Sequence, residues 1–123
     1  MTQKILLIDD DQAIQAFIQV AIRKITGWET MTADSGIEGI SQARTNAPDA
    51  ILLDISMPDM DGFQVFEQLQ SDPLTRSIPV ILLRAKILPN DHRRFAEMGI
   101  AGVITKPFDP IGVWQQVAKV LGW

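Results

Sequence analysis

Five short apolar runs, separated by longer stretches of helical periodicity, constrain the fold of this chain more than any other sequence feature. Three runs are nearly continuous, at residues 5–8, 50–53 and 80–83, and two weaker ones lie at residues 29–33 and 101–104. Short continuous apolar runs are typical of strands that are buried on both faces of a parallel sheet. We therefore expect five strands in one parallel sheet.

Each apolar run is followed by the signals of a helix. The clearest helical segment ends at Gly27 and has apolar residues at three-and-four spacing: Ile14, Phe17, Ile18, Ala21, Ile22 and Ile25. This spacing predicts that the six residues share one buried helix face. Further helices are expected after Ser35, after Asp61, between Pro89 and Gly99, and from Asp109-Pro110, which has the N-cap and first-turn proline of a helix start.

The alternation of strand and helix predicts an α/β fold. The expected architecture is a single (βα)5 domain over residues 1–123, doubly wound, with a five-stranded parallel sheet and helices on both faces. A chain of 123 residues, 46% of them hydrophobic, has room for one such core.

Composition excludes several classes of function. A net charge of −4 gives no basic surplus for binding a phosphate backbone, so we expect no direct contact with nucleic acid. The absence of cysteine excludes disulfides, thiol catalysis and zinc–thiolate sites. The sequence has neither a signal-peptide pattern nor an apolar run of membrane-spanning length, so we expect no membrane partner and a cytoplasmic location.

Charged residues stand where four of the apolar runs stop. Asp9 to Asp11 follow the first run, Asp54 follows the third, Arg84 follows the fourth, and Lys106 follows the fifth after Thr105. Any one of them is also explained by a strand that ends as it reaches water. Because ligands of open parallel sheets bind at the carboxyl ends of the strands, the four together predict a site at this edge.

Aspartates gathered at one edge predict a cation site. Two carboxylates about 5 Å apart repel by roughly 3 kcal/mol at an effective dielectric constant of about 20, so a proton, a cation or a paired side chain is needed. Oxygen ligands of this kind suit Mg²⁺. Asp54 could then act as a carboxylate nucleophile towards a phosphoryl group, with Lys106 as a movable positive charge for its oxygens.

Three motifs together resemble the receiver domain of two-component response regulators, the CheY-like proteins. They are IDDD at residues 8–11, ILLDISMPDMDG at 51–62 and TKPF at 105–108, and the resemblance spans the whole chain.

The resemblance implies a role for each matching residue. Asp54 is the implied phosphoacceptor and Lys106 the residue that contacts the phosphoryl group. The implied Mg²⁺ ligands are Asp9, Asp10, Asp54 and the Ser56 carbonyl, with Asp10 as the expected direct ligand of the acidic pair. Asp11 is expected only to cap the first helix.

Two positions depart from the pattern of the family. Arg84 stands where the family usually has threonine or serine, and Val103 stands where it usually has an aromatic residue; these residues normally couple phosphorylation to the surface. Three accounts of Arg84 remain open: it pairs with Asp54 or the phosphoryl group, it belongs to a binding surface, or its stem packs on the following helix while its head reaches water.

By this resemblance, the chain is expected to be a single-domain response regulator or an excised receiver domain. It would take a phosphoryl group from a sensor histidine kinase or a histidine phosphotransfer protein, assist its own phosphorylation and dephosphorylation, and act on no external metabolite. It would signal to a downstream protein through residues 89–121, where two copies could also pair. The alternative is a receiver-like module that binds its partner without phosphorylation, given Arg84 and Val103.

Overall fold

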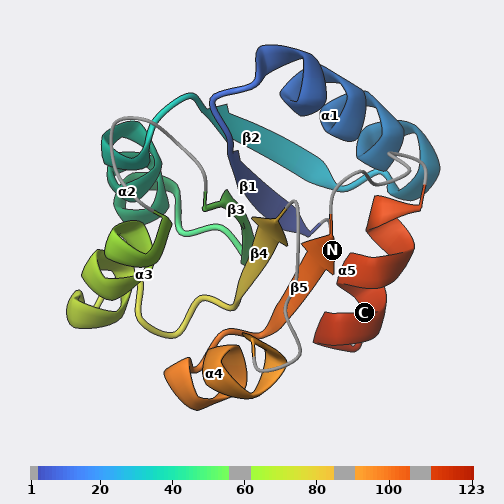
Figure 1. Cartoon of the computed structure of the whole chain (residues 1–123). Helices are drawn as coiled ribbons and strands as arrows, with labels where there is room; N and C mark the ends of the chain where they lie inside the picture. The colour runs from blue at the N-terminus through green and yellow to red at the C-terminus, as the bar shows by residue number, and fades with distance from the viewer. Residues whose placement is uncertain (1–2, 56–61, 85–90, 106–111) are drawn as a thin grey trace.

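The structure, a computed structural model, describes residues 3–55, 62–84, 91–105 and 112–123 (Figure 1). The strands are β1 (Lys4–Ile8), β2 (Glu29–Ala33), β3 (Ala50–Asp54), β4 (Val80–Arg84) and β5 (Gly102–Thr105). The helices are α1 (Gln12–Thr26), α2 (Gly36–Asn46), α3 (Gly62–Ser71), α4 (Asp91–Met98) and α5 (Val113–Leu121). All strands are parallel, in the order β2-β1-β3-β4-β5, which confirms the expected doubly wound α/β fold.

The sheet is covered on both faces, as Figure 1 shows: α1 and α5 lie on one side, and α2, α3 and α4 on the other. Alternate residues of β1 enter different cores, since Leu6 and Ile8 pack with α2, α3 and α4 whereas Ile5 and Leu7 pack with α1 and α5. These four side chains are at most 2% exposed. Burial on both faces explains why the strand sequences are continuously apolar rather than alternating.

The prediction of a single buried face on α1 is only partly right. Ile18 and Ile22 are buried, but Phe17 is 66% exposed and Ile25 is 43% exposed. Each helical residue turns by about 100°, so Phe17 lies on the flank of the stripe centred on Ile18 and Ile22. Ile25 lies in the last turn, just before the helix ends at Gly27, which takes the left-handed conformation with φ 75°.

Helix starts agree with the sequence where the structure describes them. Asp11 caps α1 by accepting hydrogen bonds from the N–H groups of Ala13 and Ile14, and Ser35 caps α2. The expected cap at Asp61 and the expected helix start at Asp109-Pro110 lie outside the described residues. Helix α5 begins at Val113, after a turn at Gly112.

Within the part of the chain that the structure describes, the helices are too short or too polar for any of them to span a bilayer.

Candidate functional site

The carboxyl edge of the two central strands carries the acidic residues. Asp9 directly follows β1, and Asp54 is the last residue of β3, which pairs with β1. The chain leaves β1 towards β2 and returns on the other side to β3, so the two strands flank the switch point of the sheet. Ligands of open α/β sheets bind in the crevice at such a point.

The structure brings Asp9, Asp10 and Asp54 together as predicted. One carboxylate oxygen from each lies within 4.8 Å of the others. Asp9 is fully buried and Asp54 is 3% exposed, whereas Asp10 is exposed. At 4.8 Å and an effective dielectric constant of about 20, each pair of charges repels by roughly 3 kcal/mol. The cluster therefore favours a positive charge beside it, which a bound cation can supply.

The donor set fits Mg²⁺ better than softer metals. All three groups are carboxylates, the hard oxygen ligands that Mg²⁺ prefers, and the exposed Asp10 leaves one side open to solvent. Mg²⁺ usually keeps several waters and takes only one or two carboxylates together with substrate oxygens. An arrangement of two buried acids and one exposed acid agrees with that coordination habit.

The turn between β1 and α1 is tied by its own aspartates. The N–H of Asp11 donates to Asp9 Oδ1 at 2.9 Å, while Asp11 Oδ1 accepts from Ala13 and Ile14 at the start of α1. The expected capping role of Asp11 is thereby confirmed. These hydrogen bonds orient Asp9 and Asp11, and both Asp10 and Asp11 are exposed to solvent.

Gln15 is a buried polar residue that the sequence analysis missed. It is 6% exposed, and its Nε2 lies within hydrogen-bond distance of the Asp9 carbonyl, the Ala33 carbonyl (2.9 Å) and Asp34 Oδ1 (3.0 Å). One signal could have found it. Gln15 shares the three-and-four spacing of the buried Ile18 and Ile22, so it is a polar side chain on an apolar helix face.

Three further residues were predicted for the site: Ser56, Lys106 and Arg84. Ser56 and Lys106 lie outside the described residues, so their roles stay predictions. The backbone of Arg84 ends β4, one residue beyond Leu83, whose Cα pairs with that of Asp54. The chain therefore places Arg84 at the same sheet edge as the acidic cluster.

Val103 lies on β5, an edge strand of the sheet. It pairs with Leu82 of β4 and packs, partly buried, against the core beneath α2, α3 and α4. An aliphatic side chain thus occupies a position where the family usually has an aromatic one.

Gly62 allows the chain to return closely to the residue after Asp54. A Cβ at Gly62 would lie 2.4 Å from the Ile55 Cα, closer than Cβ atoms approach in real structures. Only glycine therefore lets the start of α3 approach the end of β3 this closely.

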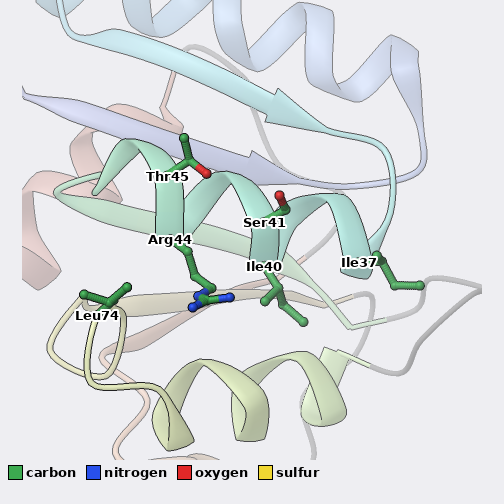
Figure 2. A pocket seen from close by; sticks show the side chains of 6 residues that line it. All are labelled: Ile37, Ile40, Ser41, Arg44, Thr45 and Leu74. Carbon is green, nitrogen blue, oxygen red and sulfur yellow. The ribbon is translucent and has the colours of Figure 1, made fainter.

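A hollow of about 390 Å³ lies between α2 and the loop after α3 (Figure 2). Its lining residues are Ile37, Ile40, Ser41, Arg44, Thr45 and Leu74. The Arg44 guanidinium extends between Ile40 and Leu74, and its Nε pairs with Asp72 Oδ2 at 2.7 Å. The charge in this hollow is therefore already compensated, and none of the lining residues belongs to the acidic cluster.

Comparison with known proteins agrees with the geometry. Residues 5–118 match the response regulator receiver domain family. The chain is 38% identical over 122 residues to the response regulator PleD of Caulobacter vibrioides, covering 98% of this chain and 26% of PleD. It thus spans about a quarter of that relative. It is 30% identical to the polar-differentiation response regulator DivK of Brucella ovis, covering 99% of this chain and 98% of DivK.

The fold is also similar to a solved receiver domain that holds a magnesium ion. The receiver domain of the sensor histidine kinase PA1611 from Pseudomonas aeruginosa, determined with a magnesium ion coordinated in its active-site cleft, superimposes with a TM-score of 0.84. The two chains are 26% identical, and the match covers 100% of each.

Proposed function

This chain belongs to the response regulator receiver domain family, and from that premise we propose that Asp54 accepts a phosphoryl group from the phosphohistidine of a histidine kinase or a histidine phosphotransfer protein. One observation carries the proposal. The Asp54 carboxylate lies at the carboxyl end of a central strand, 3% exposed, within 4.8 Å of the carboxylates of Asp9 and Asp10.

The transfer is a displacement at phosphorus. A carboxylate oxygen of Asp54 attacks, the new O–P bond forms as the P–N bond of the phosphohistidine breaks, and the imidazole nitrogen keeps the electron pair of that bond. Hydrolysis then ends the phosphorylated state: water attacks phosphorus, the O–P bond to Asp54 breaks, inorganic phosphate leaves, and the Asp54 carboxylate is regenerated. The acceptor is thus the protein itself, and no external metabolite is turned over.

Other residues of the chain prepare Asp54 for this reaction. Asp9, Asp10 and the Ser56 carbonyl would hold Mg²⁺, and Lys106 would contact the phosphoryl oxygens. Bound Mg²⁺ offsets the negative charge of the carboxylates and of the incoming phosphoryl group. The magnesium ion in the cleft of the PA1611 receiver domain supports this assignment.

The direct test is the mass of the intact protein after incubation with acetyl phosphate and Mg²⁺. One added phosphoryl group is expected. No addition to the folded protein would contradict the proposal and revive the alternative, a module that binds its partner without phosphorylation. The relatives found by sequence do not favour that alternative, since they are response regulators.

We assign Arg84 to the phosphoryl site because its backbone lies one residue beyond the partner of Asp54 at the same sheet edge. Its guanidinium fork matches phosphoryl oxygens, and a charge-assisted hydrogen bond of this kind contributes about 1.5 to 3 kcal/mol. Arg84→Thr is therefore expected to slow phosphorylation by acetyl phosphate about tenfold and to increase its dependence on Mg²⁺.

Arg93→Thr is the control for this experiment, because Arg93 is an exposed arginine of α4 that pairs with Glu97 at 3.3 Å. We expect it to leave the phosphorylation kinetics unchanged. If Arg84→Thr alters neither the phosphorylation rate, nor the phosphoryl lifetime, nor the Mg²⁺ dependence, Arg84 does not belong to the site.

The exposed apolar residues of α1 supply a docking face for the phosphodonor protein. Phe17 is 66% exposed and Val20 is 53% exposed, one turn apart on the outer side of the helix. Phe17 lies about 9 Å along the helix axis from Asp11, at a rise of about 1.5 Å per residue. A partner that covers the crevice over Asp54 also reaches these side chains, and apolar anchors dominate such contacts.

Phe17→Ser is expected to lower kcat/KM for transfer from a phosphotransfer protein about tenfold, while phosphorylation by acetyl phosphate stays unchanged. The small donor needs no docking face, so it separates partner recognition from chemistry. Leu74→Ser serves as the control. Leu74 is also well exposed, at 61%, but it belongs to the loop before β4, at the amino ends of the strands. Equal loss in both variants would contradict this docking face.

Downstream contacts, and pairing of two copies, are proposed for residues 89–121. This stretch contains α4, β5 and α5, which are adjacent at one end of the sheet (Figure 1). Its partner would be a protein rather than nucleic acid, because the net charge of the chain is −4.

A further inference from the structure

We infer that Gln15 is a positioning residue for the acidic cluster: its buried amide fixes the peptide group that joins Asp9 to Asp10. This inference rests on the proposed function of that cluster and adds a residue outside the predicted ligand set. Gln15 lies on the first turns of α1, facing the sheet, and is 6% exposed.

The Gln15 amide links two strand ends. Nε2 reaches the Asp9 carbonyl at the end of β1, and it lies 2.9 Å from the Ala33 carbonyl, the last residue of β2. It also lies 3.0 Å from Asp34 Oδ1 in the following turn. Two N–H bonds shared among three acceptors hold the end of β1, the end of β2 and the start of α1 together.

The orientation of the amide follows from chemistry. Both carbonyls are acceptors only, so the amide nitrogen, which carries two hydrogens, must face them, while the amide oxygen would be repelled. Methionine, which has a similar length and shape but no donor, would leave these carbonyls without the amide donors that they have now. The Ala33 carbonyl keeps the Asp9 N–H as a donor, but the loss of the Gln15 donor at the Asp9 carbonyl is costly, so the turn is expected to shift.

Asp9 is held on both sides of its backbone by this arrangement. Its N–H donates to the Ala33 carbonyl at 3.1 Å, and that same carbonyl accepts from Gln15. Its own carbonyl, which shares a peptide plane with the N–H of Asp10, also accepts from Gln15. The amide therefore sets the plane from which the exposed Asp10 carboxylate projects towards Asp9 and Asp54.

Three hydrogen bonds extend the same network into α2. The Asp34 N–H donates to Glu38 Oε2 at 3.2 Å, and Gln42 Nε2 bridges Glu38 Oε1 and the Thr32 carbonyl. Asp34, which accepts a hydrogen bond from Gln15, is thus itself held by α2. The position of the peptide group between Asp9 and Asp10 is therefore defined by hydrogen bonds as well as by packing.

The test is Mg²⁺ affinity, measured by titration calorimetry without any phosphodonor. Gln15→Met is expected to weaken Mg²⁺ binding about tenfold, the low end of the effect of removing a partner that orients metal ligands. Gln19→Met is the matched control. Gln19 lies one turn further along α1, and its amide donates to the Thr30 carbonyl at 3.4 Å, away from the acids. We expect its Mg²⁺ affinity to equal that of the wild type.

The outcomes separate this inference from the proposed function. Failure of the wild type to bind Mg²⁺ contradicts the metal part of the proposed function. Wild-type binding with an unchanged affinity in Gln15→Met overturns only the role of Gln15. A purely structural role of Gln15 would lower the melting temperature of Gln15→Met and leave its Mg²⁺ affinity equal to that of Gln19→Met.

If Gln15→Met does not fold, nuclear magnetic resonance of the wild-type protein decides the question. The side-chain NH₂ of Gln15 is expected to exchange slowly with solvent and to shift on addition of Mg²⁺ more than that of Gln19. Rapid exchange of the Gln15 amide, with no shift on Mg²⁺ addition, would overturn the inference.

Discussion

Replacement of Asp54 by asparagine is expected to abolish phosphorylation by acetyl phosphate. The amide oxygen of asparagine is a poor nucleophile, and the neighbouring carboxylates cannot substitute: Asp9 is fully buried, and Asp10 is expected to bind the metal. Intact-protein mass spectrometry should show one phosphoryl group on the wild type and none on Asp54→Asn. Asp54→Ala should give the same result, which removes slow deamidation of asparagine as a source of residual activity.

The control for Asp54→Asn is Asp49→Asn. Asp49 is an exposed residue just before β3 whose carboxylate accepts a hydrogen bond from the Lys4 N–H at 2.8 Å, and asparagine can accept the same bond. The change of net charge is identical, and full phosphorylation is expected. Phosphorylation of Asp54→Asn to the wild-type level would move the acceptor to another residue and contradict the proposed function.

Asp54→Asn should also stabilise the folded protein when Mg²⁺ is absent. It removes one of the three charges that lie within 4.8 Å of one another, where each pair repels by roughly 3 kcal/mol before any compensation by neighbouring groups. A gain of about 1 kcal/mol or more in the free energy of unfolding is expected, measured by urea denaturation in EDTA. Such a gain would mean that the acidic cluster is retained at a cost in stability.

The sequence predicted those parts of the fold and the site that depend on local pattern. Continuous apolar runs identified the strands, and the parallel sheet then required that Asp9 and Asp54, at the ends of adjacent strands, meet at one edge. The cap at Asp11 followed from the residue type alone. Each of these inferences uses a rule that holds regardless of the rest of the chain.

The features that the sequence did not predict depend on tertiary contacts. Phe17 has the spacing of a core residue, yet it is 66% exposed, whereas the stripe of Ile18 and Ile22 is buried. Gln15 has a polar side chain that is ordinarily exposed, and only the positions of the Asp9 and Ala33 carbonyls explain its burial. Both cases depend on how α1 packs on β1 and β2 in space, which the spacing of apolar residues along the helix does not give.

Removal of Asp10, the proposed exposed ligand, should strongly weaken the binding of the metal. Asp10→Asn is expected to weaken Mg²⁺ binding about 100-fold, because it removes one full charge from a site in which charge supplies the affinity. The phosphorylation rate at low Mg²⁺ should fall in parallel and recover as the Mg²⁺ concentration is raised. The two effects are measured by calorimetric titration and by the Mg²⁺ dependence of phosphorylation by acetyl phosphate.

Asp11→Asn distinguishes a ligand from a nearby charge. Asparagine caps a helix as well as aspartate does, so α1 keeps its start, while the charge change equals that of Asp10→Asn one residue away. We expect its Mg²⁺ affinity to stay within about threefold of the wild type, since the solvent screens an exposed charge that does not touch the metal. Equal losses in the two variants would mean that the turn attracts Mg²⁺ only through its total charge, and Asp10 would then not be a ligand.

Thermal stability gives an independent measure of the same binding. A ligand that binds only the folded state adds about 2.7 kcal/mol when its concentration is 100 times its dissociation constant. Excess Mg²⁺ should therefore raise the melting temperature of the wild type and of Asp11→Asn, and should raise that of Asp10→Asn much less at the same concentration. A rise of equal size in Asp10→Asn would place the ion elsewhere, because a site that has lost its direct ligand cannot contribute the same binding free energy.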